Sequence, residues 1–184
     1  AGVDVVFPVL HGPFGEDGAT QGALDTAGLP YAGSDVLASA VCMDKLTLKR
    51  LCGFHGIPQV GFAQAFTPGW EEEALGLEFP LWVKPSRLGS SVGITRVRSP
   101  ADLSAAIELA ARYDGELVIE QLIEGGEYTV GILDGEALPS IRIVPPGEYY
   151  DYHAKYVSDD TQYLCPGLEG DAEARMRALA LRAF

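Results

Sequence analysis

The stretch that decides the fold is "FPLWVKPSRLGSSVGI", residues 79–94. An apolar run typical of a buried strand ends at Lys84, and a second apolar run follows a loop of Gly and Ser. Small residues let backbone N–H groups converge on an anion, and the Lys84 ammonium can meet a phosphate oxygen. Ser90 and Ser91 add hydroxyl donors to this loop. The stretch therefore predicts a phosphate-binding hairpin, although it contains neither the Walker nor the Rossmann glycine pattern.

Two other interpretations of the loop stay open at this point. One is a glycine-rich turn with a solvated lysine and no ligand. The other is the nucleophile elbow of a serine hydrolase, because "GSSVG" matches G-x-S-x-G with Ser91 as the nucleophile and His153 as a partner. That elbow requires a helix directly after the serine, whereas the strand-like run "VGITRV" follows here, which disfavours the hydrolase.

The composition excludes some classes of partner. The chain has 184 residues and a formal charge of −13, which argues against nucleic acid or an anionic membrane as the main partner. No apolar run approaches the roughly 18 to 20 residues of a membrane-spanning helix, and we expect no signal peptide. Three cysteines without paired spacing indicate a reducing cytoplasm. An anion site would depend on few lysines, since the chain has only Lys45, Lys49, Lys84 and Lys155.

The first 43 residues follow the pattern of an α/β domain. Residues 3–10 form a nearly continuous apolar run, which predicts a parallel strand buried on both faces. The residues after it predict a helix that ends at Gly28 and a second helix that begins at Ser34. A third helix is expected to end at Gly56.

From about residue 57 the pattern changes to antiparallel α+β. Ser99 and Pro100 predict the capped start of a helix, and the Asp134–Gly135 pair predicts a hairpin turn. We therefore expect a domain boundary near residue 43. Strands are expected in the runs 60–66, 79–83, 92–97 and 116–123.

Residues 145–161, "PPGEYYDYHAKYVSDDT", do not fit a core element. Aromatic and charged side chains are mixed there without a helical or strand period. A loop of this length in a compact domain is typically a lid or a binding loop, so we predict that 145–161 closes over a site.

Four stretches together resemble the D-alanine–D-alanine ligases of the ATP-grasp superfamily, in that family's order. The resemblance runs from residue 3 to about residue 167. The four are "LHGPFGEDGATQGALDTAGLPYAGSDVLASAVCMDK", the hairpin "FPLWVKPSRLGSSVGI", "LVIEQLIEGGEYTVGIL" and "YYDYHAKYVSDDTQYLCP".

The resemblance implies a fold that is α/β and α+β. Residues 1–43 would be the end of a Rossmann-like N-terminal substrate domain. An ATP-grasp fold of two α+β subdomains would follow, the central one at 44–122. Residues 123–184 would be the start of the C-terminal subdomain, which would be truncated, and residues 145–161 would be its lid.

The resemblance also implies an ATP site. Lys45, Lys84 and Lys155 would contact the phosphates, with Ser91 beside them. The carboxylate of Glu120 would accept a hydrogen bond from the adenine amino group. The remaining nucleotide contacts would come from the main chain of Gln121 and Ile123, from Glu127 at the ribose and from Tyr149 stacked on the adenine.

The implied reaction joins two D-alanines through an acyl phosphate. Tyr156 would meet Ser90 across the closed site, and His11 and Glu16 would lie at the D-alanine side. The tyrosine favours an amine acceptor, and ligases that use D-lactate or D-serine as the acceptor are the alternative. A nucleotide-binding fragment without activity is a further alternative. A cytoplasmic homodimer is expected from the family.

The family's Mg²⁺ ligands and its transition-state arginine are expected after residue 184, and a substrate-binding glutamate before residue 1. Residues 1–184 alone are therefore expected to bind nucleotide weakly and not to turn over. The run "CPGLEG" departs from the "CPA"-like run of the family.

Overall fold

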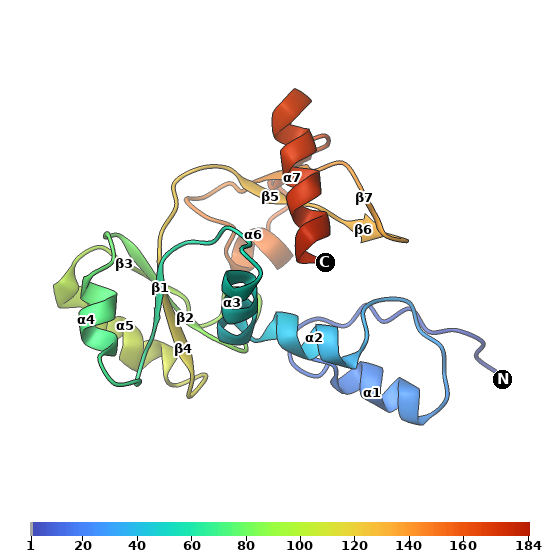
Figure 1. Ribbon diagram of the computed structural model, residues 1–184, viewed down its shortest axis with the longest axis horizontal. Helices are drawn as coiled ribbons and strands as arrows, with labels where there is room; N and C mark the ends of the chain where they lie inside the picture. Colours follow the sequence, from blue (N-terminus) through green and yellow to red (C-terminus); the bar gives the residue numbers. More distant parts are fainter. Residues whose placement is uncertain (1) are drawn as a thin grey trace. The chain divides into compact units, whose positions relative to one another are not determined.

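The computed structural model describes residues 2–184 and divides into two compact units (Figure 1). Unit 1 contains the chain up to Leu51 together with Val60–Leu122, and unit 2 contains Cys52–Gln59 and Ile123–Phe184. The chain changes unit between Leu122 and Ile123, whereas the boundary expected near residue 43 lies inside unit 1. The division into three domains stays a prediction. No helix among the described residues has both the length and the apolar character needed to cross a membrane.

Unit 1 is built on a four-stranded antiparallel sheet in the order β1-β4-β2-β3. Each strand overlaps a run that the sequence predicts as a strand, although β2 continues two residues past its predicted run, to Pro85. Strand β2 forms a hairpin with β3 and pairs with β4 along its whole length. The strands are β1 (Phe62–Gln64), β2 (Leu81–Pro85), β3 (Thr95–Val97) and β4 (Leu117–Gln121).

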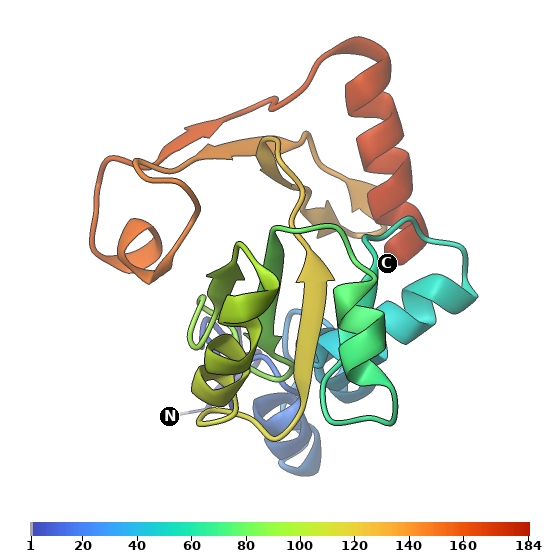
Figure 2. The same ribbon diagram turned by 90° about the vertical axis from the view of Figure 1, so that its left-hand side faces the viewer.

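The core of unit 1 lies on one face of this sheet. Side chains alternate between faces along a strand, so Leu81, Val83 and Ile119 all point to the same side, where they are fully buried. Helices α4 (Trp70–Leu75) and α5 (Leu103–Ala110) cover that face (Figure 2). Full burial of each such side chain contributes about 1.5–3 kcal/mol. The opposite face of the sheet is left for polar and aromatic side chains.

The N-terminal part of unit 1 differs from the prediction. Residues 3–10 form no strand, but only one parallel bridge between Val6 and Tyr31, and Phe7 is 76% exposed. The buried strand predicted there is wrong, because such a strand needs a partner on each side and the described residues supply only one short bridge. Helix α1 (Ala19–Thr26) ends before Gly28, as predicted.

Two predicted helix starts also need correction. Helix α2 (Val36–Met43) begins after Asp35 and not at Ser34, because the Asp35 carboxylate accepts the Ala38 N–H at 2.8 Å. Ser99 precedes a 3₁₀ turn, η1 (Pro100–Asp102), and its hydroxyl donates to the Asp102 carboxylate at 2.8 Å instead of accepting a backbone N–H.

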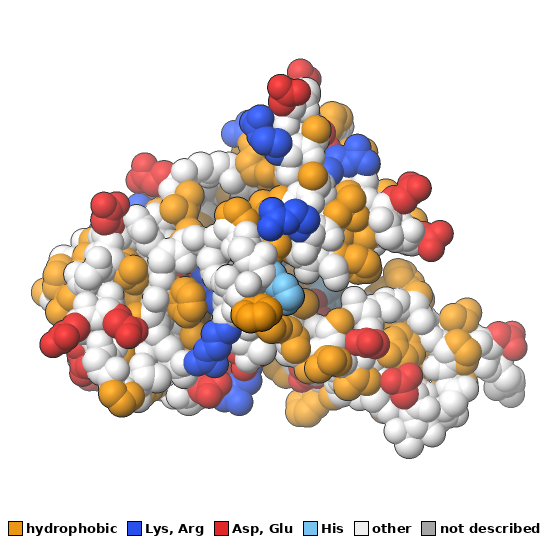
Figure 3. All heavy atoms as spheres, in the orientation of Figure 1, with side chains coloured by type: hydrophobic (Ala, Val, Ile, Leu, Met, Phe, Trp, Pro, Cys, Tyr) orange, Lys and Arg blue, Asp and Glu red, His pale blue; other side chains and the backbone are white. Residues whose placement is uncertain are grey.

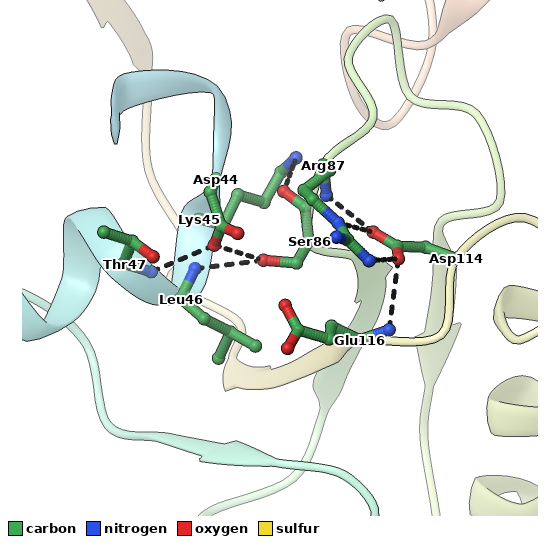
Figure 4. A network of polar contacts seen from close by, with 8 residues as sticks. All are labelled: Asp44, Lys45, Leu46, Thr47, Ser86, Arg87, Asp114 and Glu116. Atoms are coloured by element: carbon green, nitrogen blue, oxygen red, sulfur yellow. Dashed lines mark hydrogen bonds and ion pairs between the residues drawn. The ribbon is translucent and has the colours of Figure 1, made fainter. Parts of the chain in front are cut away.

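Helix α3 (Lys45–Phe54) is attached to the end of β2 by Ser86 (Figure 4). The Ser86 side chain is fully buried. Its hydroxyl donates to Asp44 Oδ1 at 2.9 Å and accepts the Leu46 N–H at 3.1 Å. The Lys45 N–H donates to the Ser86 carbonyl at 3.1 Å, and Asp44 also accepts the Thr47 N–H at 3.0 Å. These bonds fix the first turn of α3 beside the start of the glycine-rich loop.

Arg87, the next residue, ties the same loop to the turn before β4. Its guanidinium Nη2 lies 2.5 Å from Asp114 Oδ1, and its backbone N–H donates to Asp114 Oδ2 at 2.9 Å (Figure 4). The Glu116 N–H donates to Asp114 as well, at 3.1 Å. Burial alone would raise the pKa of Asp114, but the hydrogen bonds from Arg87 and Glu116 outweigh it and hold that pKa below its ordinary value.

Unit 2 contains a three-stranded antiparallel sheet, β5-β8-β9, and a separate two-stranded hairpin. The hairpin turns at Asp134 and Gly135, both with positive φ, which confirms the predicted turn. Residues 145–161 contain a short helix whose N-cap, Asp151, accepts the Ala154 N–H at 2.8 Å. The elements are β5 (Glu127–Thr129), β6 (Ile132–Leu133), β7 (Glu136–Ala137), β8 (Ile141–Val144), α6 (Tyr152–Tyr156), β9 (Gln162–Leu164) and α7 (Gly170–Ala183).

The surface is predominantly acidic. Acidic side chains are scattered over the face drawn in Figure 3 and are not gathered in one patch. This distribution agrees with the formal charge of −13.

Replacing Ser86 by Ala should destabilise unit 1. The change leaves the buried Leu46 N–H without its acceptor and removes a donor from Asp44, so we expect the free energy of unfolding to fall by about 1–3 kcal/mol. Urea denaturation measures it. Ser104→Ala, at an exposed position of α5, is the control and should change stability by no more than about 0.5 kcal/mol. Equal effects of the two substitutions would contradict the role of Ser86.

Asp114 should make the fold sensitive to acid. Its pKa is depressed in the folded state, so its contribution is fully present above the unfolded value of about 3.9 and is lost as the pH falls through the folded pKa. We therefore expect the wild-type free energy of unfolding to fall from about pH 5 to pH 2, and to fall less steeply in Asp114→Asn. Denaturation at several pH values measures both curves, and parallel curves would refute this assignment.

Candidate functional site

The face of the sheet opposite the core carries an oppositely charged pair on neighbouring strands. Lys84 of β2 and Glu120 of β4 alternate with the buried residues Val83 and Ile119, so they point to the other side. Helix α3 lies on that side of the sheet (Figure 1). The sequence thus places a charged face between the glycine-rich hairpin and α3.

Lys45 is held at the start of the glycine-rich loop. Its ammonium donates to the carbonyl oxygens of Leu88 at 2.5 Å and Ser86 at 3.2 Å. Burial lowers the pKa of Lys45, and the nearby positive charge of Lys84 lowers it further. Two ammonium groups this close repel each other, so an anion between them would be stabilised.

Glu120 is the counter-charge of this face. Its carboxylate accepts from Lys84 through Oε1, and Lys49 Nζ lies 2.8 Å from Oε2. Burial alone would raise the pKa of Glu120, but the charges of Lys84 and Lys49 outweigh it and hold that pKa below its ordinary value. The carboxylate is therefore ionised and can only accept hydrogen bonds.

The loop between β2 and β3 has the strained backbone expected of a binding loop. Ser90 and Ser91 have φ of 56° and 60°, a conformation that costs non-glycine residues energy. Gly93 also has a positive φ, of 69°, and a Cβ there would approach Tyr113 to 2.8 Å. Strand β3 follows the loop directly. A nucleophile elbow requires a helix at that point, so the hydrolase interpretation is wrong.

His11 and Glu16 line one cavity of about 570 Å³ in unit 1, and their place at a substrate stays a prediction. The Glu16 carboxylate accepts the Gly12 N–H at 2.6 Å, which closes the loop between the two residues. Gln21 lines the same cavity; it is buried, and its amide N–H donates to the Gly15 carbonyl at 3.2 Å. No motif in the sequence singles out Gln21.

Gln121 and Ile123 lie on either side of the boundary between the units. The Gln121 N–H is bonded to the Gly61 carbonyl at 3.0 Å, so the main-chain group it could offer a base is its carbonyl. Its side-chain amide donates to Glu78 at 3.1 Å. Ile123 is 65% exposed in unit 2.

The other expected nucleotide and lid residues belong to unit 2. Glu127 begins β5, while Lys155 and Tyr156 lie on α6. The Lys155 ammonium lies 5.1 Å from the centre of the Tyr150 ring. Tyr149 and Tyr156 are 39% and 48% exposed. Their roles toward residues of unit 1 stay predictions.

A pair of phenols lies on the two sides of α6 in the chain, one inside the expected lid and one in β9 just after it. The hydroxyls of Tyr150 and Tyr163 lie 2.7 Å apart. The hydrogen bond with Tyr163, followed by burial, raises the pKa of Tyr150 to about 12. The Tyr150 phenol therefore keeps its proton at neutral pH.

The structure brings Lys45, Lys84 and Glu120 together, and it adds Lys49, which the sequence analysis did not assign to the site. The signal was present, since Lys49 follows Lys45 by four residues and therefore shares its helix face. Among the described residues, no group of three or more His, Cys, Asp or Glu is placed to hold a metal ion.

Comparisons with known proteins agree on one family. The family model for the D-ala D-ala ligase C-terminus matches residues 51–184, and the model for the D-ala D-ala ligase N-terminus matches residues 1–34. A D-alanine–D-alanine ligase of Xanthomonas axonopodis pv. citri is 54% identical over 98% of this chain and 59% of its own length. A D-alanine–D-alanine ligase B of Chromobacterium violaceum is 50% identical over 100% of this chain and 61% of its own length. The chain thus spans about three fifths of these relatives.

Solved structures agree with the sequence matches. The D-alanine–D-alanine ligase of Bacillus anthracis complexed with ATP is 32% identical and superposes with a TM-score of 0.80. The match covers 98% of this chain and 58% of the Bacillus anthracis chain. The VanG D-Ala:D-Ser ligase of Enterococcus faecalis is 36% identical, with a TM-score of 0.80. The match covers 98% of this chain and 55% of the VanG chain. The chain therefore belongs to the D-alanine–D-alanine ligase family and has its ATP-grasp fold.

Proposed function

We propose that the protein carrying this chain joins two D-alanines into D-alanyl-D-alanine with ATP, for peptidoglycan precursor synthesis. The observation that carries the proposal is the pair Lys45 and Lys84, supplied by two separate elements beside the strained Ser90–Ser91 loop. Family membership supports the nature of the ligand, since a Bacillus anthracis relative was solved complexed with ATP.

The two lysines would neutralise the phosphates during transfer. Phosphoryl transfer depends mainly on positioning and on neutralised charge. In the first step a carboxylate oxygen of one D-alanine attacks the γ-phosphorus, and the bond from that phosphorus to the β-phosphate oxygen breaks. The product is an acyl phosphate and ADP. Lys45 is already held by two carbonyl oxygens, so it meets the phosphates without prior ordering of its side chain.

The second step needs protection from water. The amine of the second D-alanine attacks the acyl carbon, the carbon–oxygen bond to phosphate breaks, and the amine loses a proton. Water would hydrolyse the acyl phosphate in an open site, which gives a lid its function. We assign this function to residues 145–161, with Tyr156 and Ser90 meeting across the closed site and His11 and Glu16 at the D-alanine side.

The acceptor is the finer part of the proposal. The VanG relative is a D-Ala:D-Ser ligase, so D-serine is a second candidate, and D-lactate is a third. The natural full-length gene product should be offered ATP with D-alanine, D-serine or D-lactate, and ADP release and the condensed product should be measured. Turnover with D-alanine alone supports the dipeptide ligase. If the protein binds nucleotide but forms no product, the alternative of an inactive nucleotide-binding protein is supported.

Cellular context and assembly are proposed on the same basis. The chain has three unpaired thiols, Cys42, Cys52 and Cys165, which suits a reducing cytoplasm. A homodimer is expected from the family, and light scattering measures it. Mg²⁺ stays an expectation, with its ligands outside residues 1–184.

Replacing Lys84 by Met should weaken nucleotide binding. A charge-assisted contact contributes about 1.5–3 kcal/mol, so we expect the Kd for ADP to rise about 10- to 100-fold by calorimetry. Arg98→Met is the matched control, because it removes an exposed cation outside the site and should leave the Kd unchanged. An unchanged Kd in Lys84→Met would count against the proposed site.

Replacing Tyr156 by Phe should slow dipeptide synthesis more than it weakens ATP binding, because the hydroxyl acts on the closed lid and not on the nucleotide. A coupled ADP-release assay gives kcat, and calorimetry gives the affinity. Tyr152→Phe, on the same helix and 55% exposed, is the control. Wild-type turnover in Tyr156→Phe would remove this residue from the mechanism.

A further inference from the structure

The Glu120 carboxylate is shared between lysines of two elements. Lys84 of β2 takes Oε1, and Lys49 of α3 lies 2.8 Å from Oε2. All three side chains are largely buried, with exposed fractions of 14% for Lys49, 20% for Lys84 and 13% for Glu120. Buried ion pairs of this kind are costly to break, because the group left behind keeps its charge without a partner.

Each lysine is fixed on its own side by an aromatic ring. Phe62 of β1 and Trp82 of β2 are the register partners of Glu120 on the two neighbouring strands. The Lys49 ammonium lies 5.0 Å from the centre of the Phe62 ring, and the Lys84 ammonium lies 5.8 Å from that of Trp82. Each lysine therefore has two partners in this row of residues: the Glu120 carboxylate, and the ring of Phe62 for Lys49 or of Trp82 for Lys84.

The two lysines are not equivalent with respect to a nucleotide. Lys84 stands where β2 enters the glycine-rich loop, next to Lys45, and so can turn from Glu120 to a phosphate. Lys49 lies one turn further along α3 than Lys45, away from the loop to which Lys45 is bonded. When a phosphate attracts Lys84, Lys49 is the cation that stays on Glu120.

We propose that Lys49 is a positioning residue that sets the base specificity of the site. It stays on Glu120 when Lys84 moves to the phosphates, and it keeps Glu120 an acceptor-only carboxylate that selects the amino group of adenine over a 6-oxo base. This inference rests on the proposed ATP site.

The chemistry of the two base classes makes the selection possible. Adenine offers an amino donor at its 6 position, whereas hypoxanthine and guanine offer a carbonyl acceptor there. An ionised carboxylate accepts from the amino group and repels the carbonyl, while a protonated one carries an O–H that can donate to the carbonyl. Loss of Glu120's charge would therefore favour the 6-oxo bases.

The charged groups that face Glu120 decide its state. They are Lys49 and Lys45 from α3 and Lys84 from β2. Burial acts to raise the pKa of Glu120, and Lys84 and Lys49 lower it. Without Lys49, and with Lys84 on a phosphate, burial is opposed only by the more distant charges, so the pKa of Glu120 rises and its proton is retained to higher pH.

The test compares the affinities of ADP and inosine diphosphate in the natural full-length gene product between pH 6 and pH 9. In Lys49→Met we expect the ratio of the two Kd values to shift about tenfold toward inosine diphosphate, and the shift to be larger at the low end of the range. Lys49→Arg keeps the cation and should keep the wild-type ratio. Arg50→Met removes the neighbouring exposed cation of α3, which pairs with Gln64, and should keep the ratio as well.

A second variant covers the case in which Lys49→Met fails to fold. Glu120→Gln provides both a donor and an acceptor and should reduce the preference for ADP by itself. The double variant Lys49→Met with Glu120→Gln removes both charges of the Lys49–Glu120 pair, and its ratio should equal that of Glu120→Gln alone. A further change of ratio in the double variant would show that Lys49 acts through some other group and would overturn the inference.

The outcomes separate the two proposals. If the wild type binds ADP and Lys49→Met has the wild-type ratio at every pH, the inference about Lys49 is wrong and the ATP site stands. If the wild type binds neither nucleotide, the ATP site itself is wrong and the inference falls with it.

Discussion

A carboxylate that is almost out of contact with water must be surrounded by cations, and this constraint organises the charged face of unit 1. Glu120 meets the requirement with Lys84 on the adjacent strand and Lys49 on α3. Helix α3 can supply its lysines only if its first turn is fixed, and the buried Ser86 hydroxyl fixes it at the end of β2. The strand order, the helix position and the placement of these lysines therefore depend on one another.

The parts of this arrangement that are local in sequence were predictable. The hairpin around Lys84, the strands of the sheet and the Asp134–Gly135 turn follow from composition, period and turn chemistry. The cap of α2 was predicted within a residue, since adjacent Ser34 and Asp35 are both good caps and only packing chooses between them. Resemblance to a family, and not period, brought Lys45 and Glu120 into one site.

The parts that depend on distant partners were not predictable from period alone. Residues 3–10 have the apolar character of a buried strand but lack the flanking strands that would bury them. The sequence analysis assigned no role to Lys49, because its role depends on which face of α3 meets the sheet. Its spacing of four residues from Lys45 places both on one helix face but does not show that this face meets the sheet.

The phenol pair on the two sides of α6 has a consequence for the entropy of closing the proposed lid. Tyr150 and Tyr163 are 13 residues apart in sequence, and their hydrogen bond turns the intervening chain, with α6 inside it, into a ring. Part of the loop-closure entropy is thus already lost before any ligand arrives. Lys155 and Tyr156 therefore move together on one short helix. A substrate that closes the proposed lid has to order one closed loop and not a flexible open chain.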